Sequence, residues 1–518
     1  MLLKRQNWLV LGNLLLLVAL VAGCGAPAVT PATDAGGSNE SAAAPAESSS
    51  GELVEITYSY GGSGIPRDLQ QVQDALNEIL NEEIGVNLIL QPIDYAAFND
   101  RMQLQLAAGE PCDIIFTAPW TNSYTNNVAN GSLLELDDLL KEEAPGLWAS
   151  MPETTWDAAR INGKIYGVIN QQIFPKPWGV HVRTDLLEKY DFSLDTVTKW
   201  EDMEPFLEAV RDGEGITPVY ADDTGGSSLF RPQYYGYDPL DDGIGFIGIK
   251  ADDEALTVVN LIETPEYIEA ANLSKKWVDA GYFPSTLTSA DEARAAFRAG
   301  LFAMGYHVEK PGNDVEMQAA VGWEFESKNL TDPLILDTAG ATATLNAICA
   351  TSEHPVEAMR VLEKLNTDPV VYNLLARGIE GVHWVWADEE RKIITYPEGV
   401  DTNTSGYAPN TDWMFGNQFN AYYRDEAQVG AWEATKQMND EAYPSQALGF
   451  VIDRTPIQTE VAQTTAVLEE LGRPIAWGWV AYDEAAPELL ERLDEAGAQT
   501  IIDEVQRQLN DWKAAQGQ

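Results

Sequence analysis

The chain has 518 residues, a length that predicts two or three domains or lobes rather than one core. It contains 81 acidic and 32 basic residues, and the resulting net charge of −49 disfavours binding to the phosphates of nucleic acids. Hydrophobic residues make up 45% of the chain, with 15 Trp and 20 Tyr, so the composition indicates a folded protein rather than a disordered one.

Metal sites and cofactors are not indicated by the sequence. The chain has three cysteines and four scattered histidines, and it contains no CxxC pair. This pattern argues against a zinc or iron–sulfur site, and we expect no cofactor and no metal. Cys112 and Cys349 could form a disulfide, but we favour two separate buried thiols.

The amino terminus has the anatomy of a secretory signal. Lys4 and Arg5 precede the apolar run Trp8–Ala22, which is shorter than the roughly 20 residues of a membrane-spanning helix. The string "LVAGC" resembles the lipobox of bacterial lipoproteins. That resemblance implies cleavage before Cys24, a diacylglycerol on its thiol and an acyl chain such as palmitate on the new amino terminus. An ordinary signal peptide with a chance cysteine, or an uncleaved anchor, remain the alternatives.

Residues 24–51 consist mostly of Gly, Ala, Pro, Ser and Thr, a composition that cannot build a core and predicts a flexible tether. With the signal peptide at 1–23, the expected location is the outer face of the bacterial cytoplasmic membrane, where lipid chains anchor the protein.

The body begins with strands and helices in alternation. Residues 54–60 alternate between apolar and polar, and a helical apolar pattern follows and ends near Gly85. "VNLILQPID" predicts a second strand, a second helix ends at Gly109, and "CDIIFT" predicts a third strand. This order predicts an α/β fold with a parallel sheet that is covered on both faces. Ligands of such sheets sit beyond the carboxyl ends of the strands.

Further helices are expected near 202–211, near 266–280 and at "HPVEAMRVLEKLN". The last 70 residues form a distinct segment. Its final helix has an apolar stripe that we expect to pack on the body, namely Ile501, Ile502, Val505, Leu509 and Trp512.

Five segments in this order resemble one known family, namely "LAAGEPCDIIFT", "INGKIYGVINQQ", "GVHVRTDLLEKY", "ARAAFRAGLFAMGYH" and "HPVEAMRVLEKLNTD". The chain resembles the extracellular solute-binding lipoproteins of ATP-driven (ABC) importers, family 1-like and of the maltose-binding type. The segment 448–518 resembles an extra domain of uncharacterised role that ends a subset of these proteins. Asn170–Gln172 departs from the pattern, because many relatives have a simple Pro there.

The resemblance implies two lobes of the periplasmic-binding-protein type with a ligand cleft between them, followed by a mainly helical C-terminal segment. It also implies that the protein captures a solute, expected to be an oligosaccharide, and delivers it to permease subunits in the membrane. The implied boundaries are a body at 52–447, with lobe 1 at about 52–165 and 306–350 and lobe 2 at about 166–305 and 351–447, and an accessory domain at 448–518.

Sites for sugars combine aromatic platforms with polar forks. The residues themselves nominate strand ends and the crossing between lobes, namely Tyr60, Asp94, Trp120, Gln171, Gln172 and Trp178. The resemblance adds two loops, "DWMFGNQF" with Trp413 and Asn417, and "GGSSLFRPQYY" with Phe230 and Tyr234. Ordinary core packing is the alternative for each aromatic residue. For His181 and His307 we favour a structural role.

Catalysis is not expected. A surface-tethered glycoside hydrolase would suit the many carboxylates, but the repeated alternation of strands and helices that builds an eight-stranded barrel is missing after residue 120. The sequence has no GxSxG elbow and no P-loop. A receptor for peptides, lipids or another solute on the same fold stays open, because a fold does not fix its ligand.

Overall fold

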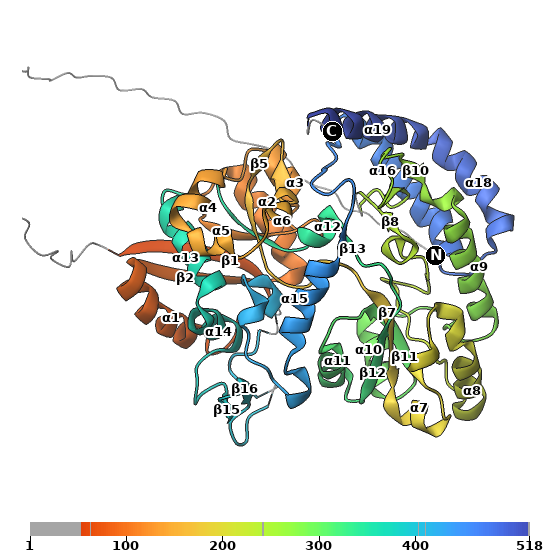
Figure 1. Ribbon diagram of the computed structural model, residues 1–518, viewed down its shortest axis with the longest axis horizontal. Coiled ribbons are helices and arrows are strands. Elements are labelled where there is room, and N and C mark those ends of the chain that lie inside the picture. Colours follow the sequence, from red (N-terminus) through yellow and green to blue (C-terminus); the bar gives the residue numbers. More distant parts are fainter. Residues whose placement is uncertain (1–52, 63, 241–242, 402–403, 410, 516–518) are drawn as a thin grey trace, which may run out of the picture. The chain divides into compact units, whose positions relative to one another are not determined.

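The computed structural model describes residues 53–62, 64–240, 243–401, 404–409 and 411–515, and Figure 1 shows their helices and strands. The predicted signal peptide (1–23), the predicted tether (24–51) and Cys24 lie outside the described residues. Within the described ranges, no helix is both long enough and apolar enough to cross a bilayer.

The first lobe contains a five-stranded sheet with neighbouring strands in the order β2 (Val86–Asp94), β1 (Val54–Gly62), β3 (Ile114–Thr117), β14 (Leu345–Ile348) and β6 (Gly167–Ile169). β1 runs parallel to both β2 and β3, as the alternation of strands and helices predicts. β14 pairs in the antiparallel sense with β3 and β6, so the sheet is mixed rather than purely parallel.

Helix α1 (Leu69–Ile84) covers the free edge of β2. Asn77 donates from Nδ2 to the carbonyl oxygen of Leu88 (3.0 Å) and accepts the N–H of Leu88 at Oδ1 (2.7 Å). Gln73 accepts the N–H of Leu90 at Oε1 (2.8 Å). These bonds satisfy backbone groups that an edge strand would otherwise leave unpaired. The predicted apolar stripe of α1 is buried, including Val72, Leu76 and Leu80.

Helices α13 (Pro355–Thr367) and α14 (Pro369–Arg377) also belong to this lobe, and Met359 and Tyr372 lie in the same core as Ile56 of β1. The other helices of the lobe are α2 (Tyr95–Ala108), α3 (Tyr124–Ala129), α4 (Asp137–Glu143), α5 (Pro145–Ala149), α6 (Glu153–Asp157), α12 (Thr338–Ala341) and α15 (Ala431–Glu441). Its short strand pairs are β4 (Arg160–Ile161) with β5 (Lys164–Ile165) and β15 (Val385–Asp388) with β16 (Ile393–Thr395).

The second lobe contains a three-stranded antiparallel sheet in the order β11 (Met304–Val308), β7 (Trp178–Arg183) and β12 (Phe325–Asn329). A second small sheet has the order β10 (Val259–Asn260), β9 (Ile247–Lys250) and β8 (Tyr237–Asp238). The helices of this lobe are α7 (Thr184–Lys189), α8 (Glu204–Glu214), α9 (Pro265–Asp279), α10 (Ala290–Arg298) and α11 (Asn313–Val321).

The chain passes between the lobes at other positions than those predicted. Val168, Ile169 and Phe174 lie in the core of the first lobe, although 166–174 was expected in the second lobe. Residues 306–330 belong to the second lobe, and the described residues between 351 and 442 belong to the first. The expectation is wrong because a short apolar strand does not reveal its partner. The pairing of β6 with β14 depends on contacts between residues far apart in the chain, such as Ile169 and Leu345.

Two of the crossing segments pair with each other. β13 (Ile335–Leu336) lies parallel to β17 (Tyr443–Pro444), with Leu336 opposite Pro444. These strands lie on the connections between the two lobes.

The C-terminal segment shares a hydrophobic core with the second lobe. Ile501, Val505 and Leu509 of the final helix are fully buried in one cluster with Phe246 and Ile249. The predicted stripe therefore packs on the body. The elements of this accessory domain are α16 (Gln458–Val467), a π-helical turn (Leu468–Gly472), α17 (Arg473–Ala476), α18 (Tyr482–Glu495) and α19 (Ala498–Ala515).

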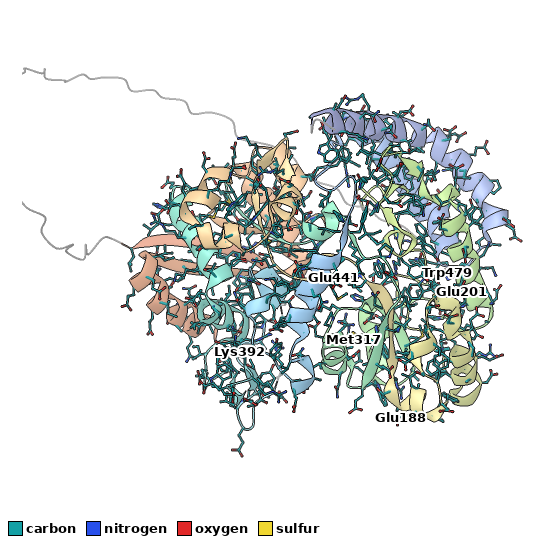
Figure 2. The ribbon with its side chains drawn as sticks, viewed as in Figure 1. Glu188, Glu201, Met317, Lys392, Glu441 and Trp479 are labelled. Carbon is teal, nitrogen blue, oxygen red and sulfur yellow. A yellow bond between two sulfur atoms is a disulfide. The ribbon has the colours of Figure 1, made fainter. Side chains whose placement is uncertain are left out.

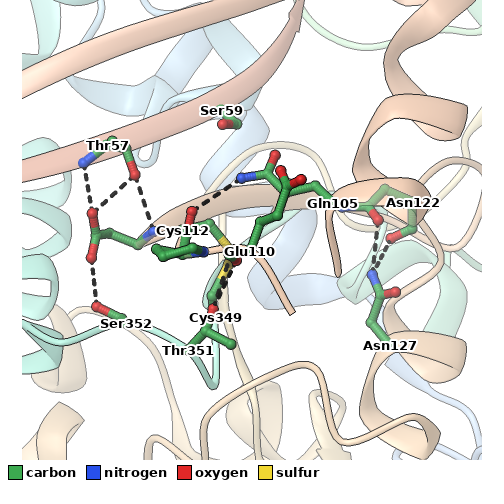
Figure 3. The surroundings of a disulfide bond; sticks show 12 residues. Thr57, Ser59, Gln105, Glu110, Cys112, Asn122, Asn127, Cys349, Thr351 and Ser352 are labelled. Atoms are coloured by element: carbon green, nitrogen blue, oxygen red, sulfur yellow. Dashed lines mark hydrogen bonds between the residues drawn. A yellow bond between two sulfur atoms is a disulfide. The ribbon is translucent and has the colours of Figure 1, made fainter. Parts of the chain in front are cut away.

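Cys112 and Cys349 form a disulfide, with their Cα atoms 5.7 Å apart (Figure 3). The expectation of separate thiols is wrong, because the antiparallel pairing of β3 with β14 sets Ile114 opposite Ile348 and brings the two cysteines together at the strand ends. The neighbouring Asp113 accepts hydrogen bonds from Thr57 (N–H and Oγ1, both 2.9 Å) and from Ser352 (Oγ, 2.6 Å).

Replacing both cysteines by serine should lower the free energy of unfolding by roughly 2–4 kcal/mol, because the bridge closes a long loop in the unfolded chain. Denaturant titration of the oxidised wild type against the double variant measures the difference. Reductant should destabilise the wild type and leave the double variant unchanged. Equal stability of the oxidised wild type and the double variant would contradict the assignment.

A buried carboxylate ties three elements of the second lobe together. Glu309 follows β11, and its Oε1 lies 2.9 Å from Nδ1 of His181 on β7. Asn313, at the start of α11, donates from Nδ2 to Oε2 of Glu309 (2.6 Å). Burial alone would raise the pKa of Glu309, but the interactions with His181 and Asn313 outweigh it and hold this pKa below its ordinary value.

Because the native pKa of Glu309 is lowered, the carboxylate adds stability above its ordinary pKa of 4.5, and that stability is lost as the pH falls through the native pKa. Glu309→Gln should therefore cost about 2–3 kcal/mol at pH 7, and the cost should shrink below pH 4.5. Denaturant titrations of both proteins between pH 7 and pH 3 check this. His307 and Asp314 lie nearby and are present in both proteins, so their titration cancels in the difference between the two free energies of unfolding. A difference that does not change with pH would therefore contradict the prediction.

Candidate functional site

Trp120 follows β3 at the carboxyl edge of the first sheet. Its side chain is 56% exposed, which is unusual for so large an apolar group. Its indole Nε1 donates to the carbonyl oxygen of Ala343 (2.9 Å), so the ring is exposed but held in place. A fixed, exposed indole offers a flat apolar face to a ligand.

Trp413 lies beside Trp120, although the two are 293 positions apart in the chain. The ring centroids of the two indoles are 6.0 Å apart, and the ring of Phe116 lies 5.9 Å from each of them. Trp413 belongs to the short 3-10 helix Asp412–Met414. The structure therefore brings two of the predicted site residues together.

Polar groups border this aromatic pair. Gln172 donates from Nε2 to Oγ1 of Thr344 (2.8 Å), and Thr344 donates to the carbonyl oxygen of Trp413 (3.4 Å). Asn439 of α15 donates to the carbonyl oxygen of Gln172 (2.7 Å). We name Trp120, Trp413, Gln172 and Thr344 the first cluster.

A second group of aromatic and polar side chains lies in the second lobe, around Trp178. The guanidinium carbon of Arg231 lies 4.5 Å from the Trp178 ring centroid and 5.3 Å from that of Tyr306. Nε1 of Trp178 donates to Oε1 of Gln233 (3.4 Å), and the ring of His307 lies 6.5 Å from that of Trp178. We name Trp178, Arg231, Gln233, Tyr306 and His307 the second cluster.

Arg231 has an unused donor. Its Nε is buried and has no hydrogen-bond partner among the residues that the structure describes. A buried donor without a partner costs free energy unless a ligand or water completes it.

Several predicted site residues instead have structural roles. Tyr60 is only 2% exposed, because its ring packs between Tyr58 (5.0 Å) and Phe415 (5.1 Å). Asp94 is exposed at the strand end, but its Oδ1 caps α2 by accepting the N–H of Ala96 (3.0 Å).

Four others pack or bond inside the lobes. Phe230 stacks on Tyr235 and belongs to the core shared with the accessory domain, and Tyr234 packs on Trp200. Gln171 is buried and donates to Ser150 Oγ (2.8 Å). Asn417 caps a 3-10 helix at Phe419 and donates to the carbonyl oxygen of Asn366 (3.3 Å).

Arg231 and Gln233 are not among the residues that the sequence nominates. The nominated residues of the same loop are their neighbours Phe230 and Tyr234, which pack into the protein. Only contacts with Trp178 and Tyr306, which come from other strands, show which side chains of this loop face the second cluster.

Both clusters are attached to the same short segment. Nε2 of Gln233 donates to Oδ2 of Asp337 (2.8 Å), and Asp337 also accepts the N–H of Gly340 at Oδ1 (2.6 Å). Ala343 and Thr344, a few residues later, hold the first cluster. Asp337 and Ala343 are six residues apart, so their Cα atoms are separated by at most about 22 Å. The two clusters are therefore connected through one short segment of the chain.

A cavity of about 2180 Å³ lies elsewhere, between the first lobe and the accessory domain. It is lined by the C-terminal half of α2, by α3, by the β4–β5 hairpin and by α16 and α19, and none of the described site residues lines it. Helix α2 begins directly after β2, so its first turn lies at the carboxyl ends of the strands. The cavity instead contacts the C-terminal half of α2, and the two ends of this helix are up to about 20 Å apart along its axis. Because α/β sheets bind ligands beyond their strand ends, we place the candidate site at the two clusters.

The site is equipped for binding by stacking and hydrogen bonding. Asp337, the carboxylate that contacts Gln233 of the second cluster, uses both oxygens to hold Gln233 and Gly340. Across the described residues, no group of three or more His, Cys, Asp or Glu side chains could hold a metal ion.

Known proteins resemble the chain along most of its length. The profile of the family "Bacterial extracellular solute-binding protein" matches residues 75–366, and that of a "Domain of unknown function (DUF3502)" matches residues 446–514. A carbohydrate ABC transporter substrate-binding protein of Streptococcus pneumoniae serotype 4 is 25% identical over 450 residues, which cover 86% of this chain and 89% of the relative.

Solved structures share the fold. The N-glycan transport solute-binding protein NgtS of Streptococcus pneumoniae matches with a TM-score of 0.79 at 23% identity, over 88% of this chain and 98% of NgtS. Its complex with Man5GlcNAc matches with a TM-score of 0.69 at 24% identity, over 89% and 98%. An extracellular solute-binding protein of Bifidobacterium longum subsp. infantis matches with a TM-score of 0.59 at 13% identity, over 88% and 98%. Because the family profile covers more than half of the chain, this protein belongs to the bacterial extracellular solute-binding proteins.

Proposed function

We propose that this protein captures an oligosaccharide between its two lobes and delivers it to the permease of an ABC importer. The observation that carries the proposal is the pair of exposed or half-buried indoles, Trp120 and Trp413, held at the carboxyl edge of the first sheet. Sugar rings present flat C–H faces that stack on such indoles, and their hydroxyls pair with amide and guanidinium groups like those of Gln172 and Arg231.

The second cluster would hold the other end of the ligand. Arg231 supplies a buried Nε donor without a partner among the described residues, which a sugar hydroxyl would complete. Trp178 supplies a second aromatic face. Because NgtS has been solved with Man1GlcNAc and Man5GlcNAc, mannose-containing N-glycan fragments are the first ligands to test.

Binding would favour a closed arrangement of the lobes, because a ligand that touches both clusters gains its full contacts only when they approach each other. A ligand shifts such an equilibrium by its difference in affinity for the two states. The permease would then recognise the closed, loaded form. We propose that the ligand is released unchanged, so the protein is a receptor and not an enzyme.

We further propose that Cys24 carries the lipid anchor. The lipobox-like "LVAGC" and the tether-like composition of 24–51 support it, although these residues lie outside the described ranges. Two or three acyl chains would hold the protein stably on the outer face of the cytoplasmic membrane.

Trp120→Ala and Trp413→Ala should each weaken the affinity for Man5GlcNAc roughly 10- to 100-fold, since each removes a stacking platform. Titration calorimetry of a soluble chain that begins at Gly25 measures the dissociation constants. Trp479→Ala is the matched control, because that indole is also exposed (41%) but lies in the accessory domain. Unchanged affinity in both variants would contradict the site, and sugar products after prolonged incubation would contradict the receptor role.

Expression of the full chain in a bacterial host with lipoprotein-processing enzymes tests the anchor. The wild type should sediment with membranes, and mass spectrometry of its mature amino-terminal peptide should show acylated Cys24. Cys24→Ser should remove the acyl mass and release the protein or leave it as the uncleaved precursor. A mature wild-type peptide without acyl chains would contradict the proposal.

A further inference from the structure

The accessory domain packs against a loop of the second lobe. Trp477 lies in the turn after α17, and its ring packs against Gly226 so closely that a Cβ at Gly226 would overlap it. Gly226 has a positive φ of 58°, which favours glycine at this position. Ser227 donates its hydroxyl to the carbonyl oxygen of Trp477.

The same turn also packs closely against helix α9. A Cβ at Gly478 (φ of 73°) would overlap the backbone of Ser274. Ser274 is fully buried and accepts the N–H of Leu229 at its Oγ (3.2 Å). Three segments therefore hold one another in position, namely the turn at Trp477, the loop 226–229 and α9.

This loop leads directly into the second cluster. Tyr306 donates its hydroxyl to the carbonyl oxygen of Gly226 (2.9 Å), and burial raises the pKa of Tyr306, so it remains a neutral donor. Arg231 follows Leu229 by two residues and lies over Tyr306 and Trp178.

A second line of contacts reaches the same loop. Tyr482 of α18 lies 6.2 Å from Tyr267, measured between ring centroids, and Tyr267 lies 5.0 Å from Phe230. Phe230 precedes Arg231 in the chain. The loop is thus held between the accessory domain on one side and the second cluster on the other.

We infer that the accessory domain positions the ligand-binding loop of the second lobe. Trp477 is the positioning residue, and through the loop it fixes where the Arg231 side chain lies in the second cluster. The inference rests on the proposed function and gives a role to a domain for which the matching profile states none. Since Trp477 belongs to neither cluster, it would act on the ligand only through the loop.

The neighbouring Trp479 provides a contrast within the same turn. The two rings are 5.1 Å apart, but Trp477 is buried (8% exposed) whereas Trp479 is 41% exposed. Figure 2 labels Trp479. The contacts with Gly226 and Ser227 are made by Trp477, so Trp479→Ala removes an indole from the same turn and leaves these contacts in place.

The test compares variants of the soluble chain by titration calorimetry with Man5GlcNAc and by amide hydrogen exchange without ligand. Trp477→Ala should weaken binding roughly tenfold and speed exchange at residues 226–231. Trp477→Phe should restore part of both, and Trp479→Ala should change neither. Ser227→Ala, which removes only the hydroxyl donor, serves if Trp477→Ala does not fold, and it should show the same effects more weakly.

Leu509→Ala separates positioning from general stability, because Leu509 is fully buried in the accessory core and belongs to neither cluster. It should lower the unfolding temperature and leave the affinity unchanged. Equal loss of affinity in Leu509→Ala and Trp477→Ala would overturn the inference, as would unchanged exchange at 226–231 in Trp477→Ala. If the wild type binds no oligosaccharide, the proposed function fails, and the exchange measurement alone decides whether Trp477 holds the loop.

Discussion

The hydrogen bonds of residues 337–344 join the two halves of the site. Asp337 holds Gln233 of the second cluster, and Ala343 and Thr344 hold Trp120 and Gln172 of the first. This short segment carries both attachments and follows the crossing strand β13, which pairs with β17. Under the proposed function, residues far apart in the sequence would in this way contact one oligosaccharide.

The second constraint is the core shared by the second lobe and the accessory domain. Leu509 and Ile501 are buried in one cluster with Phe246, so these parts are packed together as one body. Ala447 and Phe450 lie in the shared core, whereas Leu448 between them packs on the first-lobe core, so the chain runs along the boundary of the two bodies at 447–450. Any closure of the lobes would also change the cavity between α3 and α19.

The sequence predicts the local elements well, because periodicity and caps are local signals. The first three strands, helices α1 and α2 and the buried stripe of α19 all occur where the pattern places them. The pairing of Trp120 with Trp413 also agrees with the nominated loops. Long-range features were not predictable in this way: the Cys112–Cys349 bridge, the crossing points and the choice of Arg231 over Phe230 all depend on contacts between distant segments.

The central claim is that one oligosaccharide binds both clusters, and a crystal structure of the protein with Man5GlcNAc tests it most directly. The account predicts sugar rings on Trp120 and Trp413 at one end, with Arg231 and Trp178 in contact at the other. Density for the sugar in the cavity between α3 and α19, or at only one of the clusters, would contradict it.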